Sequence, residues 1–319
     1  MPRLGPKSRL VISYGIDWIL AVVIALFCLV YLQRFQQIPE FSLNDTSIQF
    51  SIKNPQTVSN DLLAVFLAIP YISLIIGHFV FSFRIWSELH ASLLGLTIGY
   101  SVSGSLVQFI RILVGRPRPD FIARCQPPPG AVNNQSFGLA NIEICQSTDT
   151  AFLIDGMRSF FSGHAILSAT GFGFLSLYLA GKLHIFDGKA YSYKLWLVSA
   201  PVIFSIWICL TRIADRRHHW QDVALGFFLG LFFAFVSYRQ FYPSLREDEC
   251  NRPYSHRTSD WDTTNSGPRL PLHNRPGWFR LPGTSNQVPD RSQNGHENEL
   301  ESLGFMTTPF EAEPNERAR

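Results

Sequence analysis

Six long apolar stretches dominate this sequence of 319 residues and constrain its fold more than any other feature. A helix that crosses a lipid bilayer needs roughly 20 predominantly apolar residues in a row. Stretches of about this length occupy residues 11–32, 62–83, 91–114, 163–180, 195–213 and 223–241. The sequence therefore predicts an all-α, polytopic membrane protein in which six transmembrane helices form a helical bundle.

The composition agrees with this class. Charged residues make up 16% of the chain, whereas soluble domains carry about 25%. The net charge of +3 is small and forms no basic stripe, which argues against a nucleic-acid partner. The first stretch is long, and no small-residue cleavage site follows it before the next polar segment, so we expect a retained anchor and no signal peptide.

The chain divides into three predicted parts. Residues 1–10 form a short N-terminal segment, and residues 11–242 form the six-span domain. From residue 243 to residue 319 the chain is rich in Pro, Asn, Arg, Ser, Asp and Glu. Such a segment cannot bury enough apolar surface to offset its ordering entropy, so we predict a disordered tail. The sequence gives this tail no chemical role.

Six spans place both termini on one face of the membrane and the loops after spans one, three and five on the other. Two glycosylation sequons begin at Asn44 and Asn134, and both lie in loops of this second face. They favour a lumenal or exterior position for it, because N-glycosylation marks surface loops of secreted segments. Arg3, Lys7 and Arg9 favour cytosolic termini. We therefore expect an integral protein of an endomembrane (vacuole, ER or Golgi) or of the plasma membrane.

Cysteine usage fits the same topology. Cys125 and Cys145 both lie in the loop between the third and fourth stretches. An oxidising lumen would allow a disulfide between them, and the alternative is two free thiols.

Three polar motifs, at residues 111–119, 159–164 and 211–222, lie at the ends of the apolar stretches. In the third motif, His218 and Asp222 are four residues apart. If this turn is helical, the carboxylate faces the imidazole, fixes its tautomer and leaves the other ring nitrogen free to attack. Arg212 can bind the oxygens of the same phosphate bidentately. The alternative is a polar loop in which His218, His219, Arg216 and Arg217 contact lipid headgroups.

The second motif contains Ser162, Gly163 and His164 at the start of the fourth stretch. A helix N-terminus offers free N–H groups to an anion, Ser162 can donate its hydroxyl, and Gly163 lets a phosphate approach the backbone. His164 is placed to protonate a leaving oxygen. The alternative is a capped helix with an incidental histidine.

The first motif places Arg111 and Arg118 seven residues apart at the end of the third stretch. Arg111 falls within the apolar run, where a charge is costly unless it meets an anion or a wet cavity. Arg116 has no evident assignment beyond surface charge. No His, Cys and Asp cluster has zinc spacing, and no Gly-rich loop precedes a Lys, so we expect no metal and no other cofactor. Three arginines can offset the phosphate charge themselves.

Together these motifs resemble the type-2 phosphatidic acid phosphatases, or lipid phosphate phosphatases, of the vanadium-haloperoxidase-like superfamily. That family's signature is Lys-x6-Arg-Pro, Pro-Ser-Gly-His and Ser-Arg-x5-His-x3-Asp. The order and spacing match here, with Arg111, Phe161 and Thr211 replacing the Lys, the Pro and the first Ser of the third motif. The resemblance covers about residues 61–242. The run at 118–125 looks like the fungal and plant branch, which includes diacylglycerol pyrophosphate phosphatases.

The resemblance implies a metal-independent phosphoric monoester or diphosphate hydrolase whose partners are a lipid phosphate and the bilayer. Phosphatidate, lysophosphatidate and diacylglycerol pyrophosphate are the implied substrates. His218 would attack phosphorus and form a phosphohistidine, Asp222 would orient His218, and His164 would protonate the leaving oxygen. The implied phosphate ligands are Arg111, Arg118, Ser162, Gly163 and Arg212. The oligomeric state stays open.

Three alternatives remain at this point. A phosphatase of the same superfamily could act on sphingoid, polyprenyl or sugar phosphates, which the motifs do not distinguish. An inactive membrane scaffold would typically lose a catalytic histidine, but His164 and His218 are both present. A transporter would place its polar site at mid-membrane in broken helices, whereas the charges here cluster at the ends of the stretches.

Overall fold

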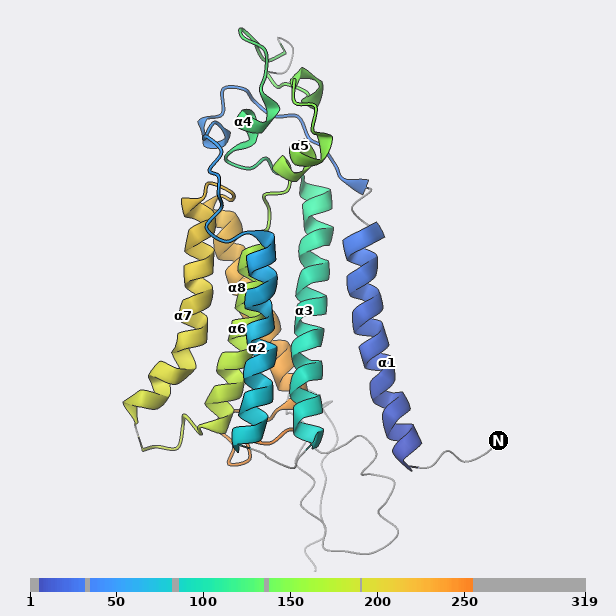
Figure 1. Cartoon of the computed structure of the whole chain (residues 1–319), viewed down its shortest axis with the longest axis vertical. Coiled ribbons are helices and arrows are strands. Elements are labelled where there is room, and N and C mark those ends of the chain that lie inside the picture. The colour runs from blue at the N-terminus through green and yellow to red at the C-terminus, as the bar shows by residue number, and fades with distance from the viewer. Residues whose placement is uncertain (1–5, 32–34, 82–85, 135–137, 190, 255–319) are drawn as a thin grey trace, which may run out of the picture. The chain divides into compact units, whose positions relative to one another are not determined.

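A computed structural model describes residues 6–31, 35–81, 86–134, 138–189 and 191–254. Six long helices run side by side in alternating directions (Figure 1). They are α1 (Pro6–Leu26), α2 (Asn60–Phe81), α3 (Trp86–Val114), α6 (Gly163–Lys182), α7 (Ser192–Ala214) and α8 (Trp220–Phe241). A short π-helical turn, Phe27–Tyr31, follows α1. The described part of the chain contains no strand, only an isolated antiparallel bridge between Phe41 and Ala140.

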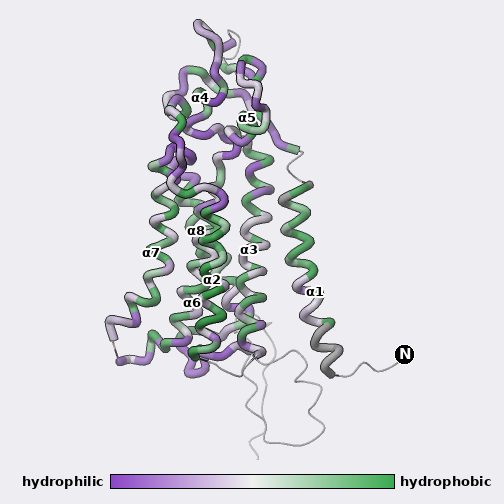
Figure 2. Tube along the Cα trace, viewed as in Figure 1, coloured by the Kyte–Doolittle hydropathy of each residue, from purple (hydrophilic) through white to green (hydrophobic). Residues whose placement is uncertain are grey.

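Five of these helices, α2, α3, α6, α7 and α8, are long and apolar enough to cross a membrane. Apolar residues line their middle parts, and polar residues gather toward their ends (Figure 2). The all-helical, polytopic class is therefore confirmed for the described residues. The apolar part of α1 runs only from Ile12 to Leu26, so the predicted first span stays a prediction.

Helix α6 occupies the centre of the bundle. Its apolar 18-residue segment is 83% buried, whereas the corresponding segments of the other four apolar helices are 28–39% buried. Small residues allow this, because they let helix backbones approach closely in a membrane bundle. A Cβ added at Gly230 of α8 would lie 2.5 Å from the Ile166 carbonyl oxygen of α6. The two backbones are therefore almost in contact.

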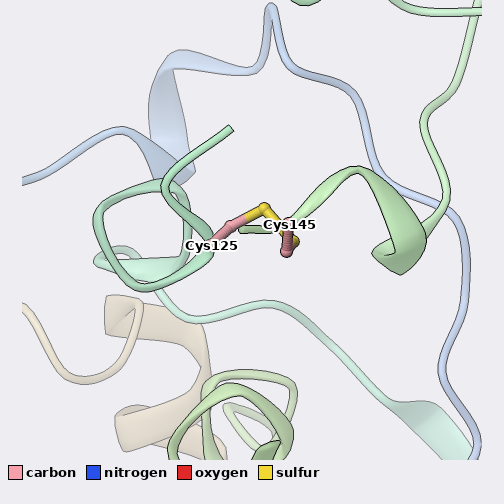
Figure 3. Close-up of a disulfide and its surroundings, with 2 residues drawn as sticks. All are labelled: Cys125 and Cys145. Carbon is pink, nitrogen blue, oxygen red and sulfur yellow. A yellow bond between two sulfur atoms is a disulfide. The ribbon is translucent and has the colours of Figure 1, made fainter. Parts of the chain in front are cut away.

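The loops after α1 and α3 form a polar cap at one end of the bundle (Figure 1). The cap contains two short α-helices, α4 (Phe121–Cys125) and α5 (Thr150–Gly156), and two 3₁₀ turns, η3 (Thr46–Ile48) and η4 (Ile142–Ile144). It has its own apolar core, which includes Phe41, Phe121 and Met157. Cys125 and Cys145 form a disulfide with their Cα atoms 4.5 Å apart (Figure 3). The bridge from Phe41 to Ala140 joins the two loops, so the cap folds as one layer.

Residues 243–254, which the composition assigned to the tail, pack against the other end of the bundle. Cys250 is 2% exposed, and its thiol lies 3.5 Å from the Gly181 carbonyl oxygen. The Tyr254 amide donates to the Phe241 carbonyl at 2.9 Å. Lys182 pairs with buried Glu88 and also donates to the Asn251 carbonyl at 2.6 Å. The rest of the predicted tail, residues 255–319, and residues 1–5 lie outside the described residues.

Candidate active site

A cavity of about 340 Å³ lies where the cap meets the ends of α2, α3 and α6. Six of the residues predicted for the site line it: Arg111, Arg118, Gly163, His164, Arg212 and His218. Polar residues that the sequence did not single out also line it: Gln56, Asn60, Gln108, Asp155 and Arg217. The fold thus brings the three motifs to one cavity.

His218 lies just before α8, and its residue is 3% exposed. Its Nδ1 is 2.7 Å from the Ser159 carbonyl oxygen. A carbonyl can only accept, so Nδ1 carries the proton, and Nε2 of the neutral ring keeps its lone pair. Burial, together with Arg118 and Arg111, lowers the pKa of His218 well below its ordinary value. The ring is therefore neutral near pH 7, as a nitrogen nucleophile must be.

The contact expected between Asp222 and His218 does not form. Helix α8 begins at Trp220, and His219 is its N-cap with extended backbone, so His218 precedes the helix and the four-residue helical spacing does not apply. Asp222 instead closes a capping box with the His219 amide at 3.2 Å. Its carboxylate also accepts from the Ser159 hydroxyl at 2.5 Å. Asp222 therefore has no direct contact with the His218 ring but is linked to it through Ser159, whose carbonyl accepts from the imidazole.

Arg116 has a role beyond surface charge, although its side chain is 33% exposed. Its Nη1 lies 2.5 Å from Oδ1 of Asp222, whose side chain is fully buried. Asp222 thus connects all three motifs, because its partners are Arg116 of the first, Ser159 of the second and His219 of the third.

The three predicted phosphate-binding arginines are each held by a neighbour while they line the cavity. Arg111 Nε donates to the Phe161 carbonyl at 2.9 Å. Arg118 Nη2 lies 2.8 Å from Asp155 Oδ1. Arg212 Nη2 lies 3.0 Å from Asp215 Oδ2. Held guanidinium groups lose little further freedom when they bind an oxyanion.

Gly163 leaves room for the end of the Arg111 side chain. A Cβ at residue 163 would lie 2.9 Å from Arg111 Nη2. Any larger residue would push the guanidinium away from the start of α6. The role expected for Gly163 therefore extends to making room for an arginine.

Ser162 and His164 differ in their relation to the cavity. Ser162 is the N-cap of α6, and its hydroxyl accepts from the Ala165 amide at 3.4 Å. It does not line the cavity, so the hydroxyl contact expected with phosphate has no support in this geometry. His164 does line the cavity, and its Nε2 is buried without a hydrogen-bond partner among the described residues. This nitrogen is available to a bound group.

Asp215, which the sequence did not single out, ties Arg212 to the loop before α2. It accepts from Lys53 Nζ at 2.7 Å and from the Thr57 amide at 2.8 Å. Burial acts to raise the pKa of Asp215, but the hydrogen bonds from Lys53 and Thr57 outweigh it and lower the pKa below its ordinary value. The carboxylate is therefore ionised when it pairs with Arg212.

No group of three His, Cys, Asp or Glu side chains within the described ranges is placed to hold a metal ion.

Comparison with known proteins agrees with the motifs. The sequence pattern of the PAP2 superfamily matches residues 91–246. A probable diacylglycerol pyrophosphate phosphatase 1 of Schizosaccharomyces pombe is 39% identical over 175 residues, which cover 54% of this chain and 62% of the relative. Lipid phosphate phosphatase 1 of Arabidopsis thaliana is 37% identical over 169 residues, which cover 53% of this chain and 50% of the relative.

Diacylglycerol pyrophosphate phosphatase 1 of Saccharomyces cerevisiae is 31% identical over 265 residues, which cover 82% of this chain and 88% of the relative. The chain thus spans less than two thirds of the first two relatives and most of the third. A search of the solved structures finds no match. The fold and the site define a helical membrane protein with histidines and arginines around one cavity. The chain belongs to the PAP2 superfamily.

Proposed function

We propose that this chain is an integral-membrane phosphatase that hydrolyses phosphatidate, lysophosphatidate or diacylglycerol pyrophosphate without a metal. The observation that carries the proposal is the state of His218. Its Nδ1 proton is held by the Ser159 carbonyl, which leaves Nε2 a lone pair on a ring that lines an arginine-rich cavity. The names of the three relatives support a lipid phosphate or pyrophosphate as substrate.

The reaction proceeds in two displacements at phosphorus. Nε2 of His218 attacks phosphorus, and the bond from phosphorus to the lipid-side oxygen breaks. His164, which takes up a proton when the negatively charged phosphate binds beside it, gives that proton to the leaving oxygen. Water then attacks the phosphohistidine, its proton passes to His164, and inorganic phosphate leaves with the His218 lone pair restored. Arg111, Arg118 and Arg212 hold the non-bridging oxygens throughout. Asp222 orients His218 through Ser159.

Apolar side chains line the deeper part of the cavity, where the lipid part of the substrate would begin. Leu63, Val107 and Leu167 line the same cavity from α2, α3 and α6. Each lies three or four residues deeper along its helix than a polar lining residue, which corresponds to about one helical turn, or 5 Å. The headgroup can therefore enter the polar end of the cavity while the acyl chains stay in lipid.

The test is phosphate release from the three lipids in detergent micelles with excess chelator. His218→Gln should abolish release and should leave the elution of the protein on size exclusion unchanged. His184→Asn, at the other end of the bundle, is the matched control and should keep full activity. If the chelator abolishes phosphate release, the enzyme needs a metal and this part of the proposal is wrong. If the His218→Gln variant still releases phosphate, the nucleophile is another residue. No release by the wild type would direct the search to sphingoid, polyprenyl and sugar phosphates.

A further inference from the structure

An ion network forms part of the cavity wall and continues behind it. Arg118 and Arg217 both line the cavity, and each is paired with one carboxylate. Arg118 Nη2 lies 2.8 Å from Asp155 Oδ1, and Arg217 Nη1 lies 3.3 Å from Asp120 Oδ2. Both carboxylates also contact Arg124. We call these five residues the arginine–aspartate network.

Arg124 holds the network together but does not line the cavity. Its side chain is 0% exposed. Nε and Nη2 donate to the two oxygens of Asp120 at 3.1 and 3.0 Å, and Nη1 donates to Asp155 Oδ2 at 3.0 Å. Nη1 also donates to the Phe152 carbonyl at 3.0 Å, and the guanidinium lies over the Phe152 ring at 4.3 Å. All three nitrogens of Arg124 are thus engaged with protein.

The charge balance of the network depends on Arg124. Three arginines and two aspartates give a net charge of +1. Without Arg124, two arginines would face two carboxylates, and the network would be neutral. Asp120 is buried, so water would not screen its charge, whereas the Asp155 side chain is 46% exposed. Arg118 and Arg217 would then be occupied by their own aspartates.

Two arginine nitrogens of the network have unused hydrogen-bonding capacity. Nε of Arg118 and Nε of Arg217 are both buried, and neither has a hydrogen-bond partner in the part of the chain that the structure describes. A buried donor without a partner is costly, and a bound oxyanion would satisfy it. Because Arg217 lines the cavity, its guanidinium can bind an oxyanion there together with the three predicted arginines.

We propose that Arg124 is a positioning residue that sets the affinity of the cavity for a phosphoryl group. Arg124 supplies one of the three positive charges that face Asp120 and Asp155, and the network therefore keeps one net positive charge toward the ligand. This inference rests on the proposed function in one respect, namely that the ligand of the cavity is a phosphate. A purely structural role would instead make Arg124 a link between α4 and α5.

The test compares the affinity of three variants for inorganic phosphate, measured from the rise in unfolding midpoint with phosphate concentration, together with kcat and KM. Arg124→Gln should weaken phosphate binding on the order of tenfold, and KM should rise with it. Arg124→Gln combined with Asp120→Asn, which removes a buried carboxylate that does not line the cavity, returns the network to a net charge of +1 and should recover much of the affinity. Arg124→Lys keeps the charge and should stay nearest to the wild type.

The double variant decides between the two roles. If it binds phosphate as weakly as Arg124→Gln or more weakly, the charge-balance role is wrong. If Arg124→Gln does not fold, Asp120→Asn alone raises the net charge by one and should tighten phosphate binding, and unchanged or weaker binding overturns the proposal. If the wild type hydrolyses the lipids but all variants bind phosphate with the same affinity, the role of Arg124 is wrong and the proposed function is unaffected. A wild type that neither binds phosphate nor releases it from lipid would remove both.

Discussion

At the scale of single residues, Ser159 connects the groups that carry the chemistry. Its hydroxyl donates to Asp222 and its carbonyl accepts from His218, so one residue joins the buried carboxylate to the proposed nucleophile. A backbone carbonyl leaves no trace in a sequence motif, because every residue type has one. The direct contact expected between Asp222 and His218 was therefore replaced by a contact that side-chain spacing could not indicate.

The buried, neutral state of His218 has a consequence for stability. Burial and the nearby arginines lower its folded pKa well below the unfolded value of about 6.5. Between these two values the unfolded chain binds one more proton than the folded protein, so His218 favours unfolding as the pH falls below about 6.5. His218→Asn keeps an N–H donor for the Ser159 carbonyl but does not titrate. The fall in unfolding midpoint from about pH 7.5 to about pH 5.5 should be smaller in this variant. Equal falls in both proteins would mean that His218 does not resist protonation.

The sequence predicted the site unevenly. Six motif residues predicted to act together do line one cavity, because each motif lies at a span end on the same face. Arg116 and Arg217 were missed, since an arginine near a span end resembles one that contacts lipid headgroups. Their buried carboxylate partners, Asp222 and Asp120, lie 106 and 97 residues away in the chain. Residue spacing within a motif cannot predict pairs that are so far apart in the sequence.

At the scale of elements, apolar length alone located the five helices that can span a membrane. Their ends fall within a few residues of the predicted stretches, because lipid requires a continuous helix of about that length. The cap helices α4 and α5 were not predicted. They have five and seven residues, too short to be stable alone, and are held by the disulfide and by Arg124.

The close approach of α6 and α8 can be tested with one methyl group. At Gly230, a Cβ would lie 2.5 Å from the Ile166 carbonyl oxygen and 2.6 Å from the Ala169 Cβ. Neither atom can move without shifting α6. Gly230→Ala should therefore lower the free energy of unfolding by about 1–3 kcal/mol, measured in detergent. Gly15→Ala in α1 is the control, because nothing lies within 4 Å of the added Cβ. Equal stability of the two variants would contradict this packing.

At the scale of the whole molecule, the cap and the cavity lie at one end of the bundle (Figure 1). The exposed residues Asn44 and Asn134 belong to the loops after α1 and α3, which form the cap. We propose that this end faces the lumen or the exterior and that both termini are cytosolic. Asn44→Gln and Asn134→Gln, alone and together, test this in a eukaryotic host. Endoglycosidase should shift the wild-type protein on a gel and should not shift the double variant.

A sequon placed in the loop between α6 and α7 provides the control for this topology. Lys189→Asn with Tyr191→Thr creates one, and this loop lies at the other end of the bundle. The new sequon should stay unmodified. Modification there, with none at Asn44 or Asn134, would reverse the proposed orientation.

The central position of α6 also governs how this protein can change over evolutionary time. A helix side that faces lipid only has to remain apolar, so many exchanges among Leu, Ile, Val and Phe are neutral there. Most of α6 has protein on every side, including the backbone of α8, and a change of one methyl group alters its fit. Amino-acid substitutions should therefore accumulate on the outer helices, and the sequence of α6 should change little. New substrate preferences would then arise from α2 and α3, which supply the rest of the cavity's apolar lining.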